Sequence, residues 1–294
     1  MRATLTELLT LEPLEPGVFR NIANVPNANG VAFGGQIVGQ AVVAASHGVE
    51  DKALHSVHCN FLTGASLTEP IRYVVTTLHA GRSFAARQVI AMQSRGAVFT
   101  MTASFHADEA HFEHQRPPSA PAPDPDLLDT VTTHARRMEG ALNPIAYRFF
   151  TQSRAMEVKP VSTAEWLHPG ADSHRQYWLS CEPVGALPGL SRDAGDKAAF
   201  AFISDFWLVG VGAMPHAPTP PVIQLMMASL DHSIWFHRSF DPTQWMLVDA
   251  DSPVAQGGRT LARATVFDRA GTVIASLAQE AVMRPRRQNA TQGD

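Results

Sequence analysis

The sequence predicts an α+β fold made of two modules of similar plan, and three observations support this. A pattern of strands and turns occurs twice along the chain. A helical segment with small residues precedes the first strand set, and a proline-rich stretch separates the two halves. A long helix followed by several antiparallel strands, repeated once, is typical of an α+β protein.

The repeat rests on a constant spacing between matching turns. Gly81 matches Gly257 and Gly96 matches Gly271, at offsets of 176 and 175 residues. The matched segments are 69–76 with 244–249, 81–87 with 257–263, 93–96 with 268–271, and 98–105 with 273–279. A structure should therefore superpose residues from about 30–105 on those from about 205–280.

Residues 34–45 form the helical candidate of the first half. Its apolar residues recur at three-and-four spacing, which places them along one helix face. Gly34 and Gly35 at its start let the backbone approach another group closely. By the same offset, the helix of the second half should begin near 204–208, with Asp205 at its start, where an N-cap is the simplest role for a carboxylate.

The chain divides at the proline-rich stretch 117–126, which can form neither a helix nor an inner strand. We interpret this stretch as part of a stiff linker. The expected organisation is an N-terminal module over 1–108, a linker and crossover over 109–150, a C-terminal module over 151–286 and a polar tail over 287–294.

Composition excludes several classes of function. Hydrophobic residues make up 45% of the 294 residues, the net charge is −4 and no basic block occurs, so nucleic acid is not an expected partner. The two cysteines, Cys59 and Cys181, are too few for a structural zinc site or a disulfide framework, and we expect no metal and no cofactor. No signal peptide or membrane-length apolar run is evident, so we expect a cytoplasmic protein without membrane insertion.

Four histidines lie in two expected strands. His55 and His58 are three residues apart, so strict strand alternation sends them to opposite faces, and the same argument separates His232 from His237. Hydrogen bonding within the sheet is the simpler role for each. We keep His58 as a candidate substrate contact.

Three polar residues in apolar surroundings suggest a site. Gln279 shares its strand face with Ala275 and Leu277, and Ser229 lies in an apolar strand over 223–229. A buried amide or hydroxyl is unfavourable unless it finds a hydrogen-bond partner. Asp205 is flanked by aromatic residues. From sequence alone a structural role is the slightly favoured explanation for each of the three.

Six segments, in this order, resemble the acyl-CoA thioesterase II (TesB-type) family and extend over nearly the whole chain. The Phe-Gly-Gly-Gln helix start and the Asp-His-Ser-Ile-Trp-Phe-His-Arg string are its most specific motifs. The segments are 33–41, 81–87, 101–105, 118–123, 229–238 and 279–284.

The resemblance implies a tandem double hot-dog, in which each module wraps an antiparallel sheet around a long helix. It also implies acyl-CoA as substrate, a homo-oligomer, and a catalytic set at Asp205, Ser229 and Gln279. The hydroxyl position is usually Thr in the family and is Ser229 here. Residues 63–65 read Thr-Gly-Ala where the family tends to have Arg-Pro-Gly, which affects expectations about substrate range.

The implied chemistry is hydrolysis of the thioester by a water held by Asp205, Ser229 and Gln279. Backbone N–H groups at Gly34 and Gly35 are candidates to polarise the carbonyl, and no dedicated acid is needed because a thiolate leaves readily. One alternative is a hot-dog hydratase or dehydratase of enoyl-thioesters, which is disfavoured because His232 should not face the same side as Ser229. A second is a non-catalytic acyl-CoA binding module.

Overall fold

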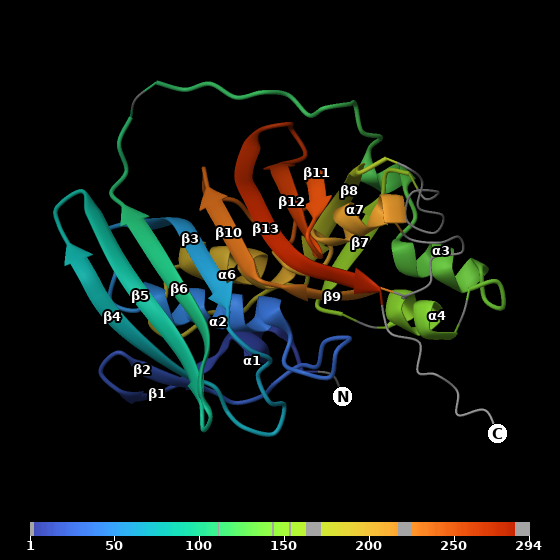
Figure 1. Cartoon of the computed structure of the whole chain (residues 1–294). Helices are drawn as coiled ribbons and strands as arrows, with labels where there is room; N and C mark the ends of the chain where they lie inside the picture. The colour runs from blue at the N-terminus through green and yellow to red at the C-terminus, as the bar shows by residue number, and fades with distance from the viewer. Residues whose placement is uncertain are drawn as a thin grey trace, which may run out of the picture.

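One antiparallel sheet dominates the computed structural model, which describes residues 3–110, 112–142, 144–152, 154–162, 172–216 and 225–285. The expected polar tail, 287–294, lies outside these residues. Thirteen strands of the described chain form the sheet in the order β1-β2-β4-β5-β6-β3-β10-β13-β12-β11-β8-β7, with β9 pairing on β13 beside this path. Figure 1 shows the sheet curving around two central helices.

The strands come from both halves of the chain. The first half supplies β1 (Leu11–Glu15), β2 (Val18–Asn21), β3 (Ala53–Phe61), β4 (Arg72–Ala80), β5 (Phe84–Gln93) and β6 (Gly96–His106). The second half supplies β7 (Met156–Pro160), β8 (His174–Cys181), β9 (Leu225–Ser229), β10 (Asp231–Phe236), β11 (Met246–Gln256), β12 (Arg259–Phe267) and β13 (Val273–Pro285).

The strand order is the same when read outward from the centre in either direction. From the central β3·β10 pair, β6, β5, β4, β2 and β1 follow on one side, and β13, β12, β11, β8 and β7 on the other. The segments matched by the repeat lie at equivalent places, since β4, β5 and β6 correspond to β11, β12 and β13. The α+β fold with two hot-dog modules is confirmed.

The helices lie mainly inside the curve of the sheet or beside its second half. They are α1 (Leu5–Leu9), α2 (Gly34–Ser46), α3 (Val131–Arg137), α4 (Pro144–Thr151), α6 (Arg192–Ser204) and α7 (Gly210–Ala213), with 3-10 turns at Pro125–Leu127 and Met214–His216. No helix of the described residues is long and apolar enough to cross a membrane.

Helices α2 and α6 pack closely because glycines of α2 face the α6 backbone. A Cβ atom on Gly35 would lie 2.2 Å from the Phe202 carbonyl oxygen, and one on Gly39 would lie 2.9 Å from that of Ala198. The two contacts run in opposite directions along the two helices, so the helices are antiparallel. The first turn of α2 therefore meets the last turn of α6.

The helix of the second half differs from the prediction. It ends at Ser204 where we expected it to begin, so the offset between the helices is 158 residues, from Gly34 to Arg192. Ser191 provides the N-cap, its side chain accepting from the Ala194 N–H. The strand offset misplaced this helix because the connection from helix to strand is longer in the second half, where it holds α7 and β9.

The linker between the modules leaves β6 and arches over the sheet to the second half (Figure 1). Side chains of the C-terminal module fix its course. Asp249 accepts from the Ser119 N–H at 2.6 Å, and the Trp178 indole N–H donates to the Pro123 carbonyl at 3.0 Å. Among the described residues between β6 and α3, the 3-10 turn at Pro125–Leu127 is the only helical element.

Candidate active site

Asp205 lies where the two central helices meet. It is the C-cap of α6, so the N-cap role expected from sequence is wrong. Its side chain is buried against the first turn of α2, since a Cβ atom on Gly34 would lie 2.7 Å from Asp205 Oδ2. The helix N-terminus that favours its negative charge is therefore that of the other module.

Ser229 and Gln279 join Asp205 from two neighbouring strands. Ser229 ends β9 and pairs in register with Ala281 of β13, while Gln279 lies two residues earlier on the same face of β13. The Ser229 hydroxyl donates to Asp205 Oδ1 at 3.2 Å. Gln279 Nε2 donates to Asp205 Oδ1 and, at 3.0 Å, to Ser229 Oγ. The three residues of the predicted set thus form one connected cluster.

These hydrogen bonds distinguish the two carboxylate oxygens. Oδ1 accepts from both Gln279 and Ser229, whereas Oδ2 lies toward Gly34. The Ser229 proton and both Gln279 N–H groups are engaged within the cluster. Oδ2 accepts from neither Ser229 nor Gln279, so it keeps acceptor capacity for an incoming group.

Burial is the main influence on the acidity of Asp205. Loss of solvent raises the pKa of its carboxyl group above the ordinary aspartate value. Hydrogen bonds from Gln279 and Ser229 and from the backbone N–H of Gly35 lower the pKa and partly offset this effect. A carboxylate with raised pKa accepts a proton more readily than an exposed one.

The first turn of α2 leaves backbone donors beside Asp205. Phe33 is the N-cap residue and makes no side-chain capping bond, and the carboxyl group of Asp205 accepts from the Gly35 N–H in its place. Gly34 is narrow enough to lie between Asp205 Oδ2 and the Phe61 ring, which would be 2.9 Å from a Cβ at this position. Gly34 and Gly35 are thus brought to the cluster.

His232 also reaches the end of α6, which the sequence interpretation did not anticipate. It is fully buried, and its Nε2 lies 2.8 Å from Ser204 Oγ, next to Asp205. The expectation that His232 and Ser229 face different sides is wrong because the chain turns at Leu230 between β9 and β10, so strand alternation does not carry across. His237, by contrast, lies on the exposed face, as expected.

The hydrogen bonds of Ser204 define the state of His232. Ser204 Oγ donates to the Ala201 carbonyl at 3.1 Å, so it accepts from the His232 Nε2–H. Burial lowers the pKa of His232 to about 3, which keeps the ring neutral and makes it a weak base. His232 supports the segment that carries Asp205 and does not contact the carboxylate cluster through any hydrogen bond described.

His58 lies apart from the cluster, on the outer face of the sheet. Its ring is exposed and its Nδ1 is 3.1 Å from Ser233 Oγ. His55 also faces outward, with Nε2 2.8 Å from Ser104 Oγ. The expectation of opposite faces is wrong because the pairing of β3 with β6 shifts between Leu54 and Ser56, and this bulge turns His55 outward.

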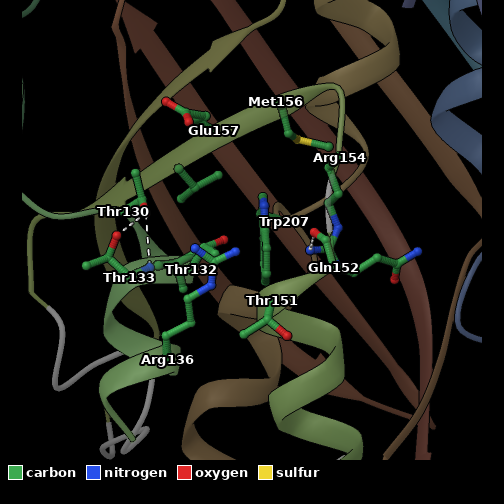
Figure 2. A pocket seen from close by; sticks show the side chains of 12 residues that line it. Thr130, Thr132, Thr133, Arg136, Thr151, Gln152, Arg154, Met156, Glu157 and Trp207 are labelled. Atoms are coloured by element: carbon green, nitrogen blue, oxygen red, sulfur yellow. Dashed lines mark hydrogen bonds between the residues drawn. The ribbon is translucent and has the colours of Figure 1, made fainter. Parts of the chain in front are cut away.

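A second concave feature has no counterpart in the sequence interpretation. A pocket of about 350 Å³ lies between α3, the end of α4 and β7. Figure 2 shows its side chains, with Trp207 between the threonines of α3 and Arg154. Its residues are far apart in sequence, and the only available signal was the density of arginine between 130 and 154.

Comparison with known proteins assigns both halves to one family. Residues 23–106 match the acyl-CoA thioesterase N-terminal domain, and residues 113–283 match the acyl-CoA thioesterase C-terminal domain. The acyl-CoA thioesterase II TesB2 from Mycobacterium marinum superposes with a TM-score of 0.76 at 29% identity, covering 96% of this chain and 98% of that one.

Two curated relatives are similar along nearly their full lengths. Acyl-coenzyme A thioesterase 8 of Homo sapiens is 33% identical, over 97% of this chain and 90% of the relative. Acyl-CoA thioesterase 2 of Haemophilus influenzae is 33% identical, over 95% of this chain and 96% of the relative. With its two hot-dog modules and matches to both domains, the chain belongs to the acyl-CoA thioesterase family.

Proposed function

We propose that the chain hydrolyses acyl-CoA thioesters to free fatty acid and CoA, using a water held by Asp205, Ser229 and Gln279. The observation that carries this is the convergence of three side chains from α6, β9 and β13 on one buried carboxylate beside the first turn of α2. Family membership supports the substrate class, and the cluster supports the roles of the residues.

In this mechanism the water binds at Asp205 Oδ2 and attacks the thioester carbonyl. Its proton passes to Oδ2 while the carbonyl oxygen gains negative charge. The N–H group of Gly34, in the first turn of α2, is positioned to stabilise that charge, because a helix N-terminus favours an anion, while the N–H of Gly35 donates to Asp205. The tetrahedral intermediate then expels the CoA thiolate, whose pKa near that of cysteine, about 8.5, removes the need for a general acid.

In this mechanism Ser229 orients the carboxylate and is not the nucleophile. Its hydroxyl donates to Asp205 and accepts from Gln279, and no imidazole of the described residues bonds to it. The cluster orients the carboxylate so that Oδ2 faces the substrate. The Ser in place of the family's usual Thr keeps the oxygen but loses the methyl group that restricts its rotamer.

Turnover of acyl-CoAs of graded chain length, followed by detection of the free thiol, tests the function. Hydrolysis of at least one acyl-CoA, lost in Asp205→Asn, is the expected result. Tight acyl-CoA binding without turnover indicates a binding module, and hydration of an enoyl-CoA without thiol release indicates the hydratase alternative. Either outcome would replace the proposed activity.

We also propose a cytoplasmic homo-oligomer. Cys59 and Cys181 are buried free thiols, as in a protein kept in a reducing compartment. The edge strands β1 and β7 end the sheet on either side and offer unpaired backbone groups for association. Light scattering together with size-exclusion chromatography measures the assembly directly, and a monomer at micromolar concentration contradicts it.

A further inference from the structure

The pocket between α3, α4 and β7 has the size and chemistry of a ligand site. Its volume of about 350 Å³ lies within the range of small-molecule pockets. Arg136, Arg154, Gln152, four threonines and Trp207 line it, and Glu157 adds one carboxylate. A lining so rich in hydrogen-bond donors suits a polar ligand better than an acyl chain.

Two arginines and one carboxylate, Glu157, line the pocket, so its net charge is positive in a negatively charged protein. Residues 130–154 contain four arginines and one acidic residue, while the whole chain carries −4. Arg136 is exposed on α3, and its guanidinium makes no ion pair or hydrogen bond within the described part of the chain. Arg137, its neighbour, pairs with Asp129 and does not line the pocket.

Arg154 places a second cation in the wall of the pocket. Its guanidinium lies over three aromatic rings, 4.3 Å from Phe206, 4.9 Å from Phe149 and 5.6 Å from Trp207. It donates to the carbonyls of Phe149 and Gln152 and has no carboxylate partner in the described part of the chain. Burial lowers its pKa only to about 10, so it remains charged at neutral pH.

The threonines of α3 add a hydrogen-bond donor to these charges. Thr130 and Thr133 bond each other through their hydroxyl oxygens at 3.0 Å. Such a bond uses one of the two hydroxyl protons, so the other can still be donated. Two guanidinium groups and a hydroxyl donor are the groups that phosphate oxygens accept from.

We propose that this pocket holds the phosphorylated end of CoA, with Arg136 contacting a phosphate and Arg154 supplying the positive field. The inference rests on the proposed thioesterase function. Trp207 is two residues after Asp205, so their Cα atoms are at most about 7 Å apart. The pocket therefore shares a wall with the catalytic segment, within reach of the flexible pantetheine arm that joins the thioester to the phosphates.

Substrate truncation combined with mutation tests the assignment. We would measure KM for one acyl-CoA and for the same acyl group on pantetheine, which lacks the phosphates. Arg136→Ala should raise KM for acyl-CoA by about tenfold, the effect of one lost charge-assisted hydrogen bond, with kcat unchanged. It should leave KM for acyl-pantetheine as in the wild type.

Arg137→Ala is the matched control, because it removes the same charge one residue away, outside the pocket. It should change neither KM. An equal rise for both substrates, an equal effect of Arg137→Ala, or no rise at all overturns the assignment. Inorganic phosphate bound in the pocket should weaken binding of acyl-CoA and leave binding of acyl-pantetheine unchanged, and equal weakening of both means that phosphate acts outside the pocket, which also overturns the assignment. In each case, turnover of acyl-CoA by the wild type tests the proposed function separately from the assignment of the pocket.

Discussion

At the residue scale, Asp205 is the group whose charge the proposed reaction needs. Asn in its place keeps the side-chain volume and an oxygen to accept from Gln279 and Ser229, but it cannot take a proton from water. We expect Asp205→Asn to lower kcat by about 10²–10⁴-fold, the usual contribution of a general base. Steady-state hydrolysis of a good acyl-CoA substrate measures this.

The control for Asp205→Asn is a thermal melt of the same preparation. A folded variant without turnover places the loss in the chemistry. Near-normal turnover with an intact fold would remove Asp205 from the mechanism, and the cluster would then be a buried structural network only.

Substitutions at Ser229 test whether this residue only orients the other groups, in which case its loss should reduce kcat less than loss of the carboxylate does. Ser229→Ala leaves Gln279 Nε2 without one acceptor and Asp205 without one donor, so we expect a loss of at least about tenfold in kcat. Ser229→Thr keeps the hydroxyl and should retain most activity. Ser233→Ala, which removes a serine that bonds His58 on the outer face, should change activity little. Mass spectrometry that traps an acyl group on Ser229 would contradict the positioning role.

At the element scale, the strands were predictable and the second helix was not. Turn residues such as Gly81 and Gly257 repeat with the strands they connect, so the constant offset predicted the positions of the strands in both halves. The helices do not share this offset, because the connection after α6 holds α7 and β9. For this reason Asp205 was predicted at the start of a helix but lies at the end of one. The bulge at His55 could not be predicted either, since one extra residue in a strand leaves no sequence signal.

The contact between α2 and α6 gives a stability prediction. Gly35→Ala places a Cβ against the Phe202 backbone carbonyl, which no rotamer change relieves, so the helices must separate. We expect a loss of about 1–3 kcal/mol in the free energy of unfolding, measured by urea titration. Because the same contact positions Asp205, kcat should fall as well.

Gly195→Ala is the paired control within α6. A Cβ there meets only Leu187, at 3.9 Å, so the substitution should stabilise the protein by up to about 1 kcal/mol through helix propensity. Equal effects of the two alanine substitutions would show that the close helix contact contributes nothing specific.

At the scale of the whole molecule, two equivalent modules build a site that is not duplicated. The counterpart of Gln279, by the offset of 176 residues, is the buried Ala103, and the C-cap of α2 is His47 where α6 has Asp205. Sequence could single out the proposed catalytic trio only through family resemblance. Nothing in the repeat distinguishes the half that carries the carboxylate, because that distinction arises where the end of one helix meets the start of the other.

Because Asp205 is buried between the modules, raising the pH through its pKa should increase activity and decrease the stability of the fold. The proposed mechanism needs the carboxylate, so kcat should fall as pH decreases through its raised pKa, with a midpoint above that of an ordinary aspartate. Gln279→Ala removes a hydrogen bond that lowers this pKa and should move the midpoint to higher pH.

For folding, a raised carboxyl pKa contributes stability that is complete below the unfolded pKa and is lost as pH rises through the folded pKa. Asp205→Asn should therefore melt at or above the wild-type temperature at pH 7, with its advantage shrinking in acid. A variant that melts well below wild type at neutral pH would show that the charge stabilises the fold, and would contradict both halves of the prediction.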